Sequence, residues 1–434
     1  MQYYNLKNQA EVVSFEEATL KGLGSGKGLY FPQEIPRLST DFMKYIGRHS
    51  KEEIGVEVMK PYVAGSLPDN VLEDIVRDTI NFPFPLMKIN ENIYSLELFH
   101  GPTFAFKDVG ARFMSRCLAY FNRNSDTKTT VLVATSGDTG GAVANGFEGI
   151  DNVNVVILYP SGKVSHVQEL QLTTGGNNIT ALEVKGTFDD CQDLVKKAFA
   201  DEDLNKKLKL TSANSINVAR WLPQQLYYFT GYTQWINQNT EPPVISVPSG
   251  NFGNICAGIL AHISGLPVKH FIAACNVNDT IPRFLQNGSY DPKPAVSTVS
   301  NAMDIAEPSN FVRILEIFNE NISSLKEVLS SISVDDETTK DTIRDIYYRE
   351  HYLLDPHGAV AFIALRKYLE THPQDQGLIL ETAHPVKFPD VIQHELKIGV
   401  PVPHRAEHLF KKEKHSVVIN PDFNEVKDFL MAHA

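Results

Sequence analysis

VLVATSGDTGGAVANGF, from Val131 to Phe147, is the stretch that decides the fold class of this chain. It begins with a β-branched apolar run, continues with glycines and small polar residues, and ends in a pattern typical of a buried helix. A strand that runs through such a turn directly into a helix is the repeating unit of a parallel α/β sheet. Because these sheets bind ligands outside the carboxyl ends of their strands, the stretch also predicts a binding site at its turn.

The same unit recurs along the chain. Apolar runs alternate with helical patterns in residues 154–172 (NVVILYP, then SHVQELQL), 243–265 (PVISVP, then NICAGILAHISG) and 269–276 (KHFIAACN). Before residue 90 the pattern differs, with amphipathic stretches such as DNVLEDIVRDTI at 69–80. The 434 residues exceed the size of one ordinary core, so we predict three parts. They are an amino-terminal segment at 1–93 that packs on the body, a small α/β domain at 94–235 and a large α/β domain at 236–434.

The composition is that of a globular protein and excludes several classes of partner. Hydrophobic residues make up 42% of the chain and charged residues 21%, and the net charge is -12. This acidic balance argues against sequence-independent binding to nucleic acid or to an anionic membrane. Any anionic ligand must therefore be bound by local donors and not by the field of the whole protein.

The cysteines and the absence of targeting patterns favour a cytoplasmic protein. The four cysteines, Cys117, Cys191, Cys256 and Cys275, are far apart and form no CxxC pair, which fits a reducing compartment. The amino terminus has no basic segment followed by an apolar one, and no run of about 18 apolar residues occurs. The 14 histidines show no HExxH or Cys/His cluster, so no metal site is predicted.

One glycine-rich stretch, GLGSGKGLYF at 22–31, resembles a nucleotide loop but fails on spacing. A GxxxxGK[ST] loop needs a glycine where Lys21 stands and a serine or threonine where Gly28 stands. A helical pattern precedes the stretch and an apolar run follows it, which is the reverse of the required order. We therefore predict a helix C-cap followed by a turn.

Three other turns carry groups that can bind anions. In the opening stretch, Ser136, Gly137, Asp138 and Thr139 stand at a helix start, where free amides and the helix dipole favour a carboxylate or phosphate. A plain N-cap with glycines in a tight turn is an equally good interpretation of these residues alone.

VISVPSGNFGNICAGI at 244–259 has the form of a phosphate-binding loop, with the residues Ser249, Gly250, Asn251, Phe252, Gly253 and Asn254 between strand and helix. Neither this turn nor the previous one fits the GxGxxG fingerprint or the nucleoside triphosphate loop. The pair therefore favours a phosphorylated cofactor other than these nucleotides.

SANSINVARWLPQQLYYF at 212–229 is the third element, with Asn214, Ser215 and Arg220 ahead of an aromatic helix. The guanidinium of Arg220 can form paired charge-assisted bonds with a phosphate or carboxylate. By itself, a position on a helix surface explains Arg220 better.

ELFHGPTFAFKDVGARF at 97–113 places Lys107 among aromatic and small residues. DVGARFMSRCLAYF reads as a helix with Val109, Phe113 and Cys117 on one face, so Lys107 stands at its amino terminus. Apolar surroundings and a helix amino terminus both favour the neutral amine over the ammonium. A lone lysine beside aromatics usually extends to solvent, but together with phosphate loops this placement is what Schiff-base chemistry with pyridoxal phosphate requires.

Several segments together closely resemble the threonine synthase family, in the form found in fungi and many Gram-negative bacteria. They are FEEATLKGLGSGKGLYFP, LFHGPTFAFKDVGARF, ATSGDTGGAVA, SANSINVAR, VPSGNFGN, VSNAMD, DPHGAVA and ETAHPVKF, in this order over nearly the whole chain. The resemblance implies a fold type II pyridoxal-phosphate enzyme, similar to the tryptophan synthase β subunit. It also implies the last step of threonine biosynthesis, in which O-phospho-L-homoserine and water give L-threonine and phosphate by γ-elimination and β-replacement.

The resemblance also implies roles for individual residues. Lys107 matches the lysine that carries the cofactor as a Schiff base, and Thr382 matches the hydroxyl that meets the pyridine nitrogen. The loop expected to bind the cofactor phosphate comprises Gly250, Asn251, Phe252, Gly253 and Asn254. The loop expected to bind the substrate carboxylate comprises Ser136, Gly137, Asp138 and Thr139, and the candidates for the substrate phosphate are Asn214, Ser215 and Arg220.

Two alternatives remain open from the sequence. One is another fold type II pyridoxal-phosphate lyase, such as a threonine or serine dehydratase or a phospho-amino-acid lyase. The other is a ligand-sensing protein that has the fold but no activity, which the retention of Lys107 with both loops disfavours. We expect the chain to act on a small molecule, without nucleic acid, membrane or metal, as a monomer or homodimer.

Overall fold

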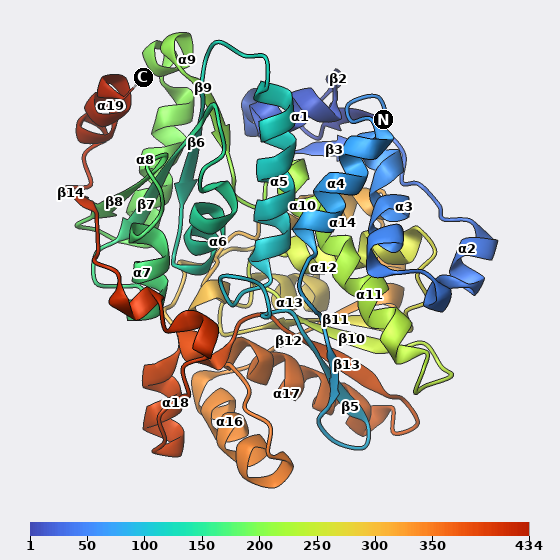
Figure 1. The fold of residues 1–434 in the computed structure, drawn as a ribbon. Helices are drawn as coiled ribbons and strands as arrows, with labels where there is room; N and C mark the ends of the chain where they lie inside the picture. The colour runs from blue at the N-terminus through green and yellow to red at the C-terminus, as the bar shows by residue number, and fades with distance from the viewer. Residues whose placement is uncertain (434) are drawn as a thin grey trace.

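Three sheets organise residues 1–433, the part of the chain that this computed structural model describes (Figure 1). The amino-terminal sheet is small and antiparallel, in the order β2-β1-β3. Its strands are β1 (Gln2–Asn5), β2 (Asn8–Ser14) and β3 (Tyr30–Pro32). The predicted amino-terminal segment thus contains a sheet that its helical patterns did not reveal.

The six-stranded sheet has the order β12-β11-β10-β13-β5-β4 and is parallel except for β4, which pairs antiparallel with β5 at one edge. Its strands are β4 (Leu86–Lys88), β5 (Ile93–Glu97), β10 (Val244–Pro248), β11 (His270–Cys275), β12 (Leu329–Ser333) and β13 (Gly377–Glu381). The central strands β10, β11 and β13 are almost entirely buried, as expected for strands covered on both faces.

The five-stranded sheet has the order β14-β8-β7-β6-β9, and all its pairings are parallel. Its strands are β6 (Thr129–Ala134), β7 (Val153–Pro160), β8 (Ile179–Val184), β9 (Lys209–Ser212) and β14 (Val417–Ile419). The predicted α/β fold with largely parallel sheets is therefore confirmed.

Helices cover the sheets and join their strands (Figure 1). In the amino-terminal half they are α1 (Phe15–Lys21), α2 (Thr40–Lys44), α3 (Lys51–Val63), α4 (Asp69–Thr79), α5 (Lys107–Asn122), α6 (Asp138–Phe147), α7 (His166–Thr173), α8 (Phe188–Ala200), α9 (Glu202–Lys207) and α10 (Val218–Trp221). The others are α11 (Gln225–Trp235), α12 (Gly253–Ile263), α13 (Thr280–Asn287), α14 (Phe311–Ile317), α15 (Ile322–Val328), α16 (Asp336–Glu350), α17 (Pro356–Thr371), α18 (Pro389–Leu396) and α19 (Phe423–Ala432). Within residues 1–433, none of the helices has the length and apolar character needed to cross a membrane.

The stretch at 22–31 is a helix C-cap and turn, as predicted. Helix α1 ends at Lys21, and Gly22 follows with φ 71°, a left-handed conformation that suits glycine. The helix begins at Phe15, directly after strand β2 ends at Ser14, and Ser14 and Glu17 form a capping box.

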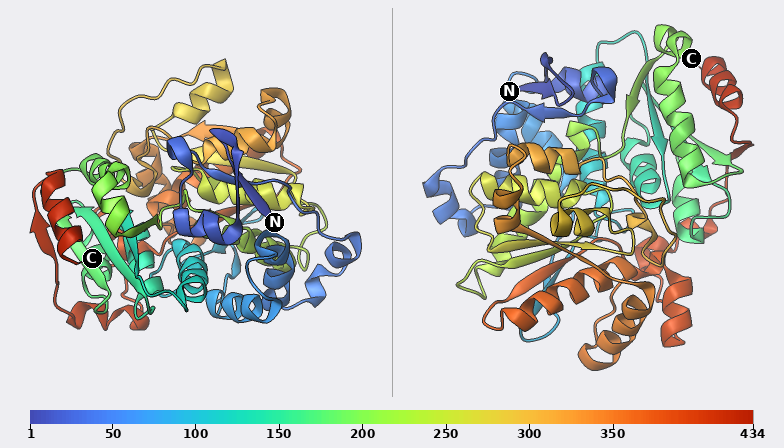
Figure 2. Two further views of the ribbon diagram at one scale, coloured as in Figure 1. Left: turned by 90° about the horizontal axis from the view of Figure 1, so that it is seen from above. Right: turned by 180° about the vertical axis from the view of Figure 1, so that it is seen from behind.

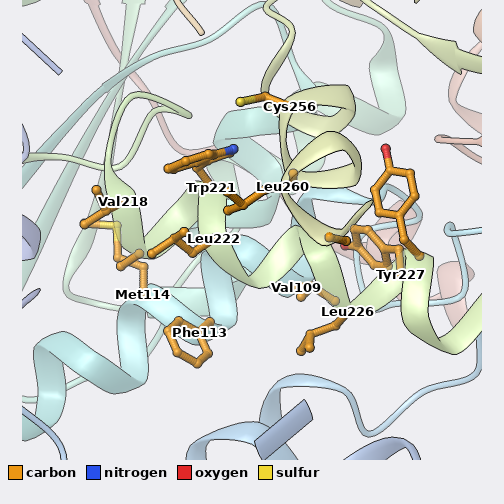
Figure 3. Packing of buried hydrophobic residues seen from close by; sticks show 14 of the residues in the cluster. Val109, Phe113, Met114, Val218, Trp221, Leu222, Leu226, Tyr227, Cys256 and Leu260 are labelled. Atoms are coloured by element: carbon orange, nitrogen blue, oxygen red, sulfur yellow. The ribbon is translucent and has the colours of Figure 1, made fainter. Parts of the chain in front are cut away.

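Helix α5 is buried along the face that its sequence pattern predicts. Val109, Phe113 and Cys117 are fully buried. Figure 3 shows Val109, Phe113 and Met114 of this helix facing Trp221, Leu222 and Leu226 of the segment from α10 to α11, with Leu260 and Cys256 of α12 near Trp221 in the upper part of the view. Each such large side chain contributes about 1.5–3 kcal/mol when buried, so this core fixes the orientation of α5 and of Lys107 at its start.

Two pieces of chain cross the bounds that the sequence suggested for the domains. Strand β5, predicted with the small domain, pairs with β13 in the six-stranded sheet. Strand β14 and helix α19, predicted with the large domain, lie on the five-stranded sheet, and Figure 2 shows α19 beside α8 at that side of the molecule. An apolar run does not reveal which sheet it will join, so sequence pattern places these pieces poorly. The division into two α/β domains itself stays a prediction.

Candidate active site

The carboxyl ends of strands from the two parallel sheets meet around one cavity of about 130 Å³. Loops that follow β6, β9, β10 and β13 reach it, together with the loop from β5 to α5. Its lining comprises Phe106, Lys107, Ala134, Thr135, Ser136, Thr139, Phe188, Gln192, Asn214, Ser215, Arg220, Gln224, Pro248, Gly250, Asn251, Phe252, Gly253, Asn254, Ala302, Met303, Ile305, His357 and Thr382. All the predicted site residues line this cavity except Gly137, Asp138 and Ser249.

Lys107 is the first residue of α5, and its side chain lies in the cavity wall. Burial, together with the nearby charges of Lys387 and Arg220, lowers the pKa of its amine to about 8, although the charge of Asp138 acts in the opposite direction. The ammonium Nζ lies 5.8 Å from the centre of the Phe106 ring. A substantial fraction of the amine is therefore neutral slightly above neutral pH, as a nucleophile or base requires.

The turn before Lys107 is held by Asp108, the second residue of the helix. The carboxylate of Asp108 accepts hydrogen bonds from the backbone N–H of Thr103 (2.9 Å) and from its hydroxyl (2.5 Å). Burial raises the pKa of Asp108 to about 6. A Cβ on Gly101 would lie 2.3 Å from an oxygen of Asp108, so only glycine fits at that position. These contacts fix the loop that aims Lys107 into the cavity.

The turn after β10 is a close-fitting cradle at the start of α12. A Cβ on Gly250 would lie 2.6 Å from Cα of Met303 and 3.0 Å from the carbonyl oxygen of Ala302. Phe252 caps the helix in the left-handed conformation, with φ 59°. The Nδ2 atom of Asn254 is buried and has no hydrogen-bond partner within residues 1–433, whereas its Oδ1 accepts from the hydroxyl of Tyr228 at 2.8 Å. The cradle thus offers a free amide donor and the amino-terminal amides of a helix.

The loops after β9 and β10 are joined by amide side chains. The hydroxyl oxygen of Ser215 accepts from Nδ2 of Asn251 (2.9 Å) and from Nδ2 of Asn310 (3.2 Å). Arg313, fully buried, donates to the carbonyl oxygens of Ser215 (3.3 Å) and Ile216 (2.6 Å). Parts of both sheets are therefore connected at the cavity, and the side chains of Asn251 and Ser215 are engaged with each other.

The turn after β6 has a conformation that only glycine adopts readily. Gly137 has φ 133°, and a Cβ there would lie 2.5 Å from the side-chain carboxamide of Gln168. The hydroxyl of Thr135 accepts from the N–H groups of Gly137 and Gly140, both at 2.9 Å. Ser136 and Thr139 consequently face the cavity from a rigid turn.

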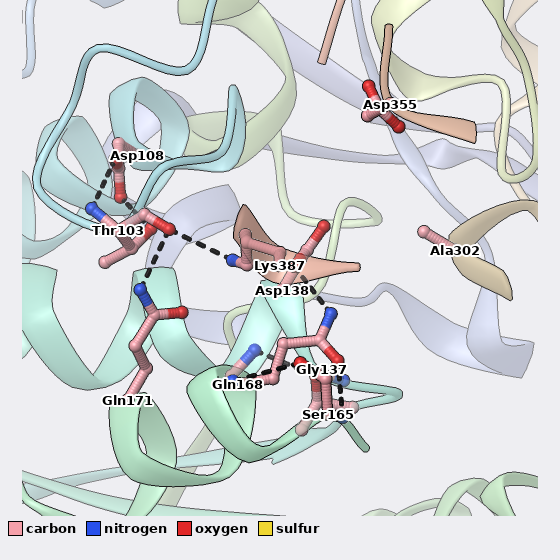
Figure 4. A network of polar contacts seen from close by, with 12 residues as sticks. Thr103, Asp108, Gly137, Asp138, Ser165, Gln168, Gln171, Ala302, Asp355 and Lys387 are labelled. Atoms are coloured by element: carbon pink, nitrogen blue, oxygen red, sulfur yellow. Dashed lines mark hydrogen bonds and ion pairs between the residues drawn. The ribbon is translucent and has the colours of Figure 1, made fainter. Parts of the chain in front are cut away.

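The side chain of Asp138 is bonded away from the cavity lining. Its Oδ1 atom lies 2.7 Å from Nζ of Lys387 and accepts from Nε2 of Gln168 at 2.9 Å (Figure 4). Although burial opposes the charged form, the nearby ammonium groups of Lys387 and Lys107 keep the pKa of Asp138 below its ordinary value. Asp138 is thus a buried carboxylate with a buried cation as its partner.

Arg220 is 3% exposed and has no carboxylate within ion-pair distance in the described part of the chain. One of its terminal nitrogens donates to the carbonyl oxygen of Ala213, and its Nε atom is buried without a partner. Burial lowers the pKa of Arg220 to about 10, so the group remains charged at neutral pH. A buried cation that lines a cavity without a counter-ion favours an anionic ligand there.

Thr382 directly follows strand β13 and lines the cavity. Its carbonyl oxygen accepts from the N–H of Phe106 at 2.9 Å, which ties the strand end to the residue before Lys107. The residue before it, Glu381, is fully buried, and burial next to Asp355 raises its pKa well above the ordinary value.

Sequence reasoning missed several residues of this region: Lys387, Gln168, His357, Ala302 and Met303. All except Gln168 stand in segments quoted above for the family resemblance (ETAHPVKF, DPHGAVA and VSNAMD), so those segments carried the signal. His357 is held by Asp355, whose Oδ1 lies 2.5 Å from Nδ1 of the ring, and its Nε2 accepts from the N–H of Ala302 at 3.2 Å. His357 therefore supports the segment that covers Gly250.

Comparison with known proteins first defines the class. The family model described as "Pyridoxal-phosphate dependent enzyme" matches residues 79–381, which include every predicted site residue except Thr382. The chain is therefore a pyridoxal-phosphate-dependent enzyme, and its cofactor is pyridoxal phosphate.

Further matches define the family within that class. Models described as "Threonine synthase N terminus" and "Threonine synthase, C-terminal" match residues 2–80 and 358–430. Threonine synthase from Haemophilus influenzae is 43% identical over 431 residues, which cover 99% of this chain and 100% of the relative. Crystal structures of threonine synthase from Escherichia coli (TM-score 0.94, 43% identity, 100% of both chains) and, with pyridoxal phosphate bound, from Brucella melitensis (TM-score 0.92, 33% identity, 100% and 99%) are also similar. The chain belongs to the threonine synthase family and thus to threonine biosynthesis.

The residues of the cavity fit this cofactor. The cradle at Gly250 leaves no room for a side chain, and Asn254 presents a buried amide without a partner. The start of α12 suits a phosphate, and the amine of Lys107 opens into the same cavity. A phosphate, a carbonyl group and a ring could therefore be met by the cradle, Lys107 and Thr382, respectively.

Proposed function

We propose that this chain converts O-phospho-L-homoserine and water into L-threonine and phosphate, as a carbon–oxygen lyase that acts on phosphates. The observation that carries the proposal is the cavity itself: one amine, Lys107, faces a phosphate cradle and a second, separate cation, Arg220. An amino acid that bears its own phosphate needs such a second cation beyond the cofactor site. A dehydratase substrate has no phosphate, so the buried Arg220 without a counter-ion disfavours that alternative.

Pyridoxal phosphate, when bound, supplies an electron sink that stabilises negative charge at the substrate carbons. We propose that Lys107 holds it covalently, that Gly250, Asn251, Phe252, Gly253 and Asn254 bind its phosphate, and that Thr382 meets its ring nitrogen. The hydroxyl of Thr382 is neutral, unlike an aspartate, so it does not hold a proton on the ring nitrogen.

Lys107 is also the proposed proton carrier. With the substrate bound, the Nζ atom of Lys107 would be placed to remove the proton from Cα of the substrate and to move protons at Cβ. The pKa of about 8 suits this role because the amine can both accept and release a proton near neutral pH. Proton transfer by a positioned group contributes about 10²–10⁴-fold to the rate.

The other predicted residues bind and orient the substrate. We propose that the turn of Ser136, Gly137, Asp138 and Thr139 binds its carboxylate through backbone N–H groups and hydroxyls, with the side chain of Asp138 turned to Lys387. Asn214, Ser215 and Arg220 are the proposed ligands of its phosphate. Arg220 contributes most of this binding, because Ser215 is already bonded to Asn251 and Asn310.

A product assay tests the proposal. Purified protein loaded with pyridoxal phosphate and supplied with O-phospho-L-homoserine is expected to release threonine and phosphate in equal amounts. The variant Lys107→Ala should release neither. Release of 2-oxobutanoate and ammonia in place of threonine would support the dehydratase alternative and overturn the proposal.

Two further properties are proposed, the location of the protein and its assembly. A cytoplasmic location fits the four cysteines, which are buried and not disulfide-bonded. A monomer or homodimer is proposed for the assembly. Cell fractionation and sedimentation at two protein concentrations test these statements.

A further inference from the structure

Lys387 is a second lysine buried beside the reacting one. It ends the short 3₁₀ helix at Pro385–Lys387, is 0% exposed, and extends to the same small region as Asp138 and Thr103 (Figure 4). Its Nζ atom lies 2.7 Å from Oδ1 of Asp138 and donates to the carbonyl oxygen of Thr103 at 3.0 Å. A lysine buried to this degree is kept charged only by a partner, and the carboxylate of Asp138 is that partner.

Asp138 acts on two lysines at once. Its charge raises the pKa of Lys107, against the lowering by burial, Lys387 and Arg220. On its own helix, Lys107 is followed by Asp108, whose carboxylate is bonded to Thr103. Asp138 is therefore the one carboxylate that raises the pKa of Lys107 among the charged neighbours that shift it.

We propose that Lys387 is a positioning residue for the reaction, because its ammonium holds the carboxylate of Asp138 and so leaves the amine of Lys107 available. This inference rests on the proposed role of Lys107. Without Lys387, the buried carboxylate would turn to the remaining ammonium nearby, and an ion pair with Lys107 would keep that amine protonated. The pair also neutralises Asp138 within the turn proposed to bind the substrate carboxylate.

A purely structural role for Lys387 makes a different prediction. The carbonyl oxygen of Thr103 keeps a second hydrogen-bond donor when Lys387 is replaced, because Nε2 of Gln171 also donates to it, at 3.0 Å. If Lys387 served only to hold that loop, neutralising Asp138 as well would not repair its loss. If Lys387 serves to occupy Asp138, the second change should restore Lys107.

The experiment measures the reactivity of the Lys107 amine in the full-length chain freed of cofactor. The protein is treated with trinitrobenzenesulfonate between pH 6 and 10, and modification of Lys107 is quantified by mass spectrometry. In Lys387→Met the apparent pKa of Lys107 is expected to rise by about one unit or more, so that modification at neutral pH slows about tenfold. In Asp138→Asn the apparent pKa of Lys107 is expected to fall, and in the double variant it is expected to return close to the native value.

Controls separate this effect from folding and from the proposed function. Lys269→Met removes a lysine from an ion pair with Asp375 that lies just before β11 and β13, at the opposite strand ends from the cavity, and should leave the Lys107 profile unchanged. If Lys387→Met does not fold, Asp138→Asn and the double variant still test the proposal. An unchanged Lys107 pKa in Asp138→Asn, or a double variant as slow as Lys387→Met, overturns the proposal. Failure to form threonine with the expected shifts in reactivity would refute the proposed function alone.

Discussion

Two basic side chains, Lys107 and Arg220, line the cavity and a third, Lys387, is buried near them, and each is paired with a carboxylate to a different degree. Lys387 has a bonded carboxylate, Lys107 has only a nearby one, and Arg220 has none within ion-pair distance in residues 1–433. This gradient fits the proposed roles, which are positioning for the fully paired Lys387, proton transfer for Lys107 and binding of an anion for Arg220.

Replacing Arg220 tests the last of these assignments. Charge-assisted hydrogen bonds contribute about 1.5–3 kcal/mol each, so Arg220→Gln should lower kcat/KM for O-phospho-L-homoserine by about 10- to 150-fold for one lost bond. Absorbance of the bound cofactor should be unchanged. Arg349→Gln, which removes an exposed arginine of α16, is the control. Unchanged kinetics in Arg220→Gln would show that the substrate phosphate binds elsewhere.

Glu381 makes a prediction about pH. Burial beside the carboxylate of Asp355 raises its pKa in the folded state, so the folded protein holds a proton that the unfolded chain releases. The protonated carboxyl makes its full contribution to the free energy of unfolding below the unfolded pKa of about 4.3. This contribution is lost as pH rises through the folded pKa, by about 1.4 kcal/mol per pH unit. Glu381→Gln has nothing to titrate and should unfold at a higher temperature than the native protein at pH 8, but not at pH 4.5.

The control for this comparison is Glu370→Gln, an exposed position on α17. It should follow the native protein at both pH values. A Glu381→Gln melting temperature that stays parallel to the native one from pH 4.5 to pH 8 would mean that Glu381 is ionised in the folded protein.

The turns at the strand ends line the cavity, and each has a backbone geometry that its residues impose. Gly137 adopts φ 133°, Phe252 begins α12 from the left-handed region, and Gly101 and Gly250 leave no space for a Cβ. The following helices then start at the cavity with unpaired amides. Binding here depends on the path of the backbone as much as on side-chain identity.

A single methyl group in the cradle tests this dependence. Gly250→Ala places Cβ against the backbone of Ala302 and Met303, and overpacking of this kind costs about 1–3 kcal/mol. We expect cofactor affinity, measured by equilibrium dialysis, to fall about 5- to 150-fold while the circular dichroism spectrum is retained. Gly399→Ala, where nothing lies within 4 Å, should bind as the native protein does. Native affinity in Gly250→Ala would exclude a tight cradle.

Across the whole molecule, local pattern predicted more than long-range pairing. The segments around β6, β10 and α5 were predicted, including the place of Lys107 at a helix start, because each pattern lies in one continuous stretch of sequence. Lys387, His357 and Ala302 were missed because only the tertiary fold brings them to the cavity. Arg220 looked like a surface residue until its burial was known, and β5 gave no sign of its sheet. Sequence pattern specifies an element, but its partner depends on packing.

The packing of β14 and α19 against the five-stranded sheet predicts how local stability is distributed. Helix α19 packs on α8 and α9 through Val426 and Leu430, both buried. Leu430→Ala should cost about 2–5 kcal/mol locally. Hydrogen exchange is therefore expected to speed up in β8 and α8 but not in β10 or β13. Asp428→Ala, on the exposed face of the same helix, should change neither set. Equal acceleration in both sheets would show that they unfold as one unit.

Covalent attachment of the cofactor to Lys107 is the central claim, and borohydride trapping tests it most directly. The native protein loaded with pyridoxal phosphate is reduced and digested, and the modified peptide is sequenced by mass spectrometry. We predict loss of the visible absorbance of the bound cofactor and a single modified residue, Lys107. In Lys107→Ala both the absorbance and the label should be absent. A label on Lys387 or on any other lysine, or native protein that takes up no label, would contradict the account.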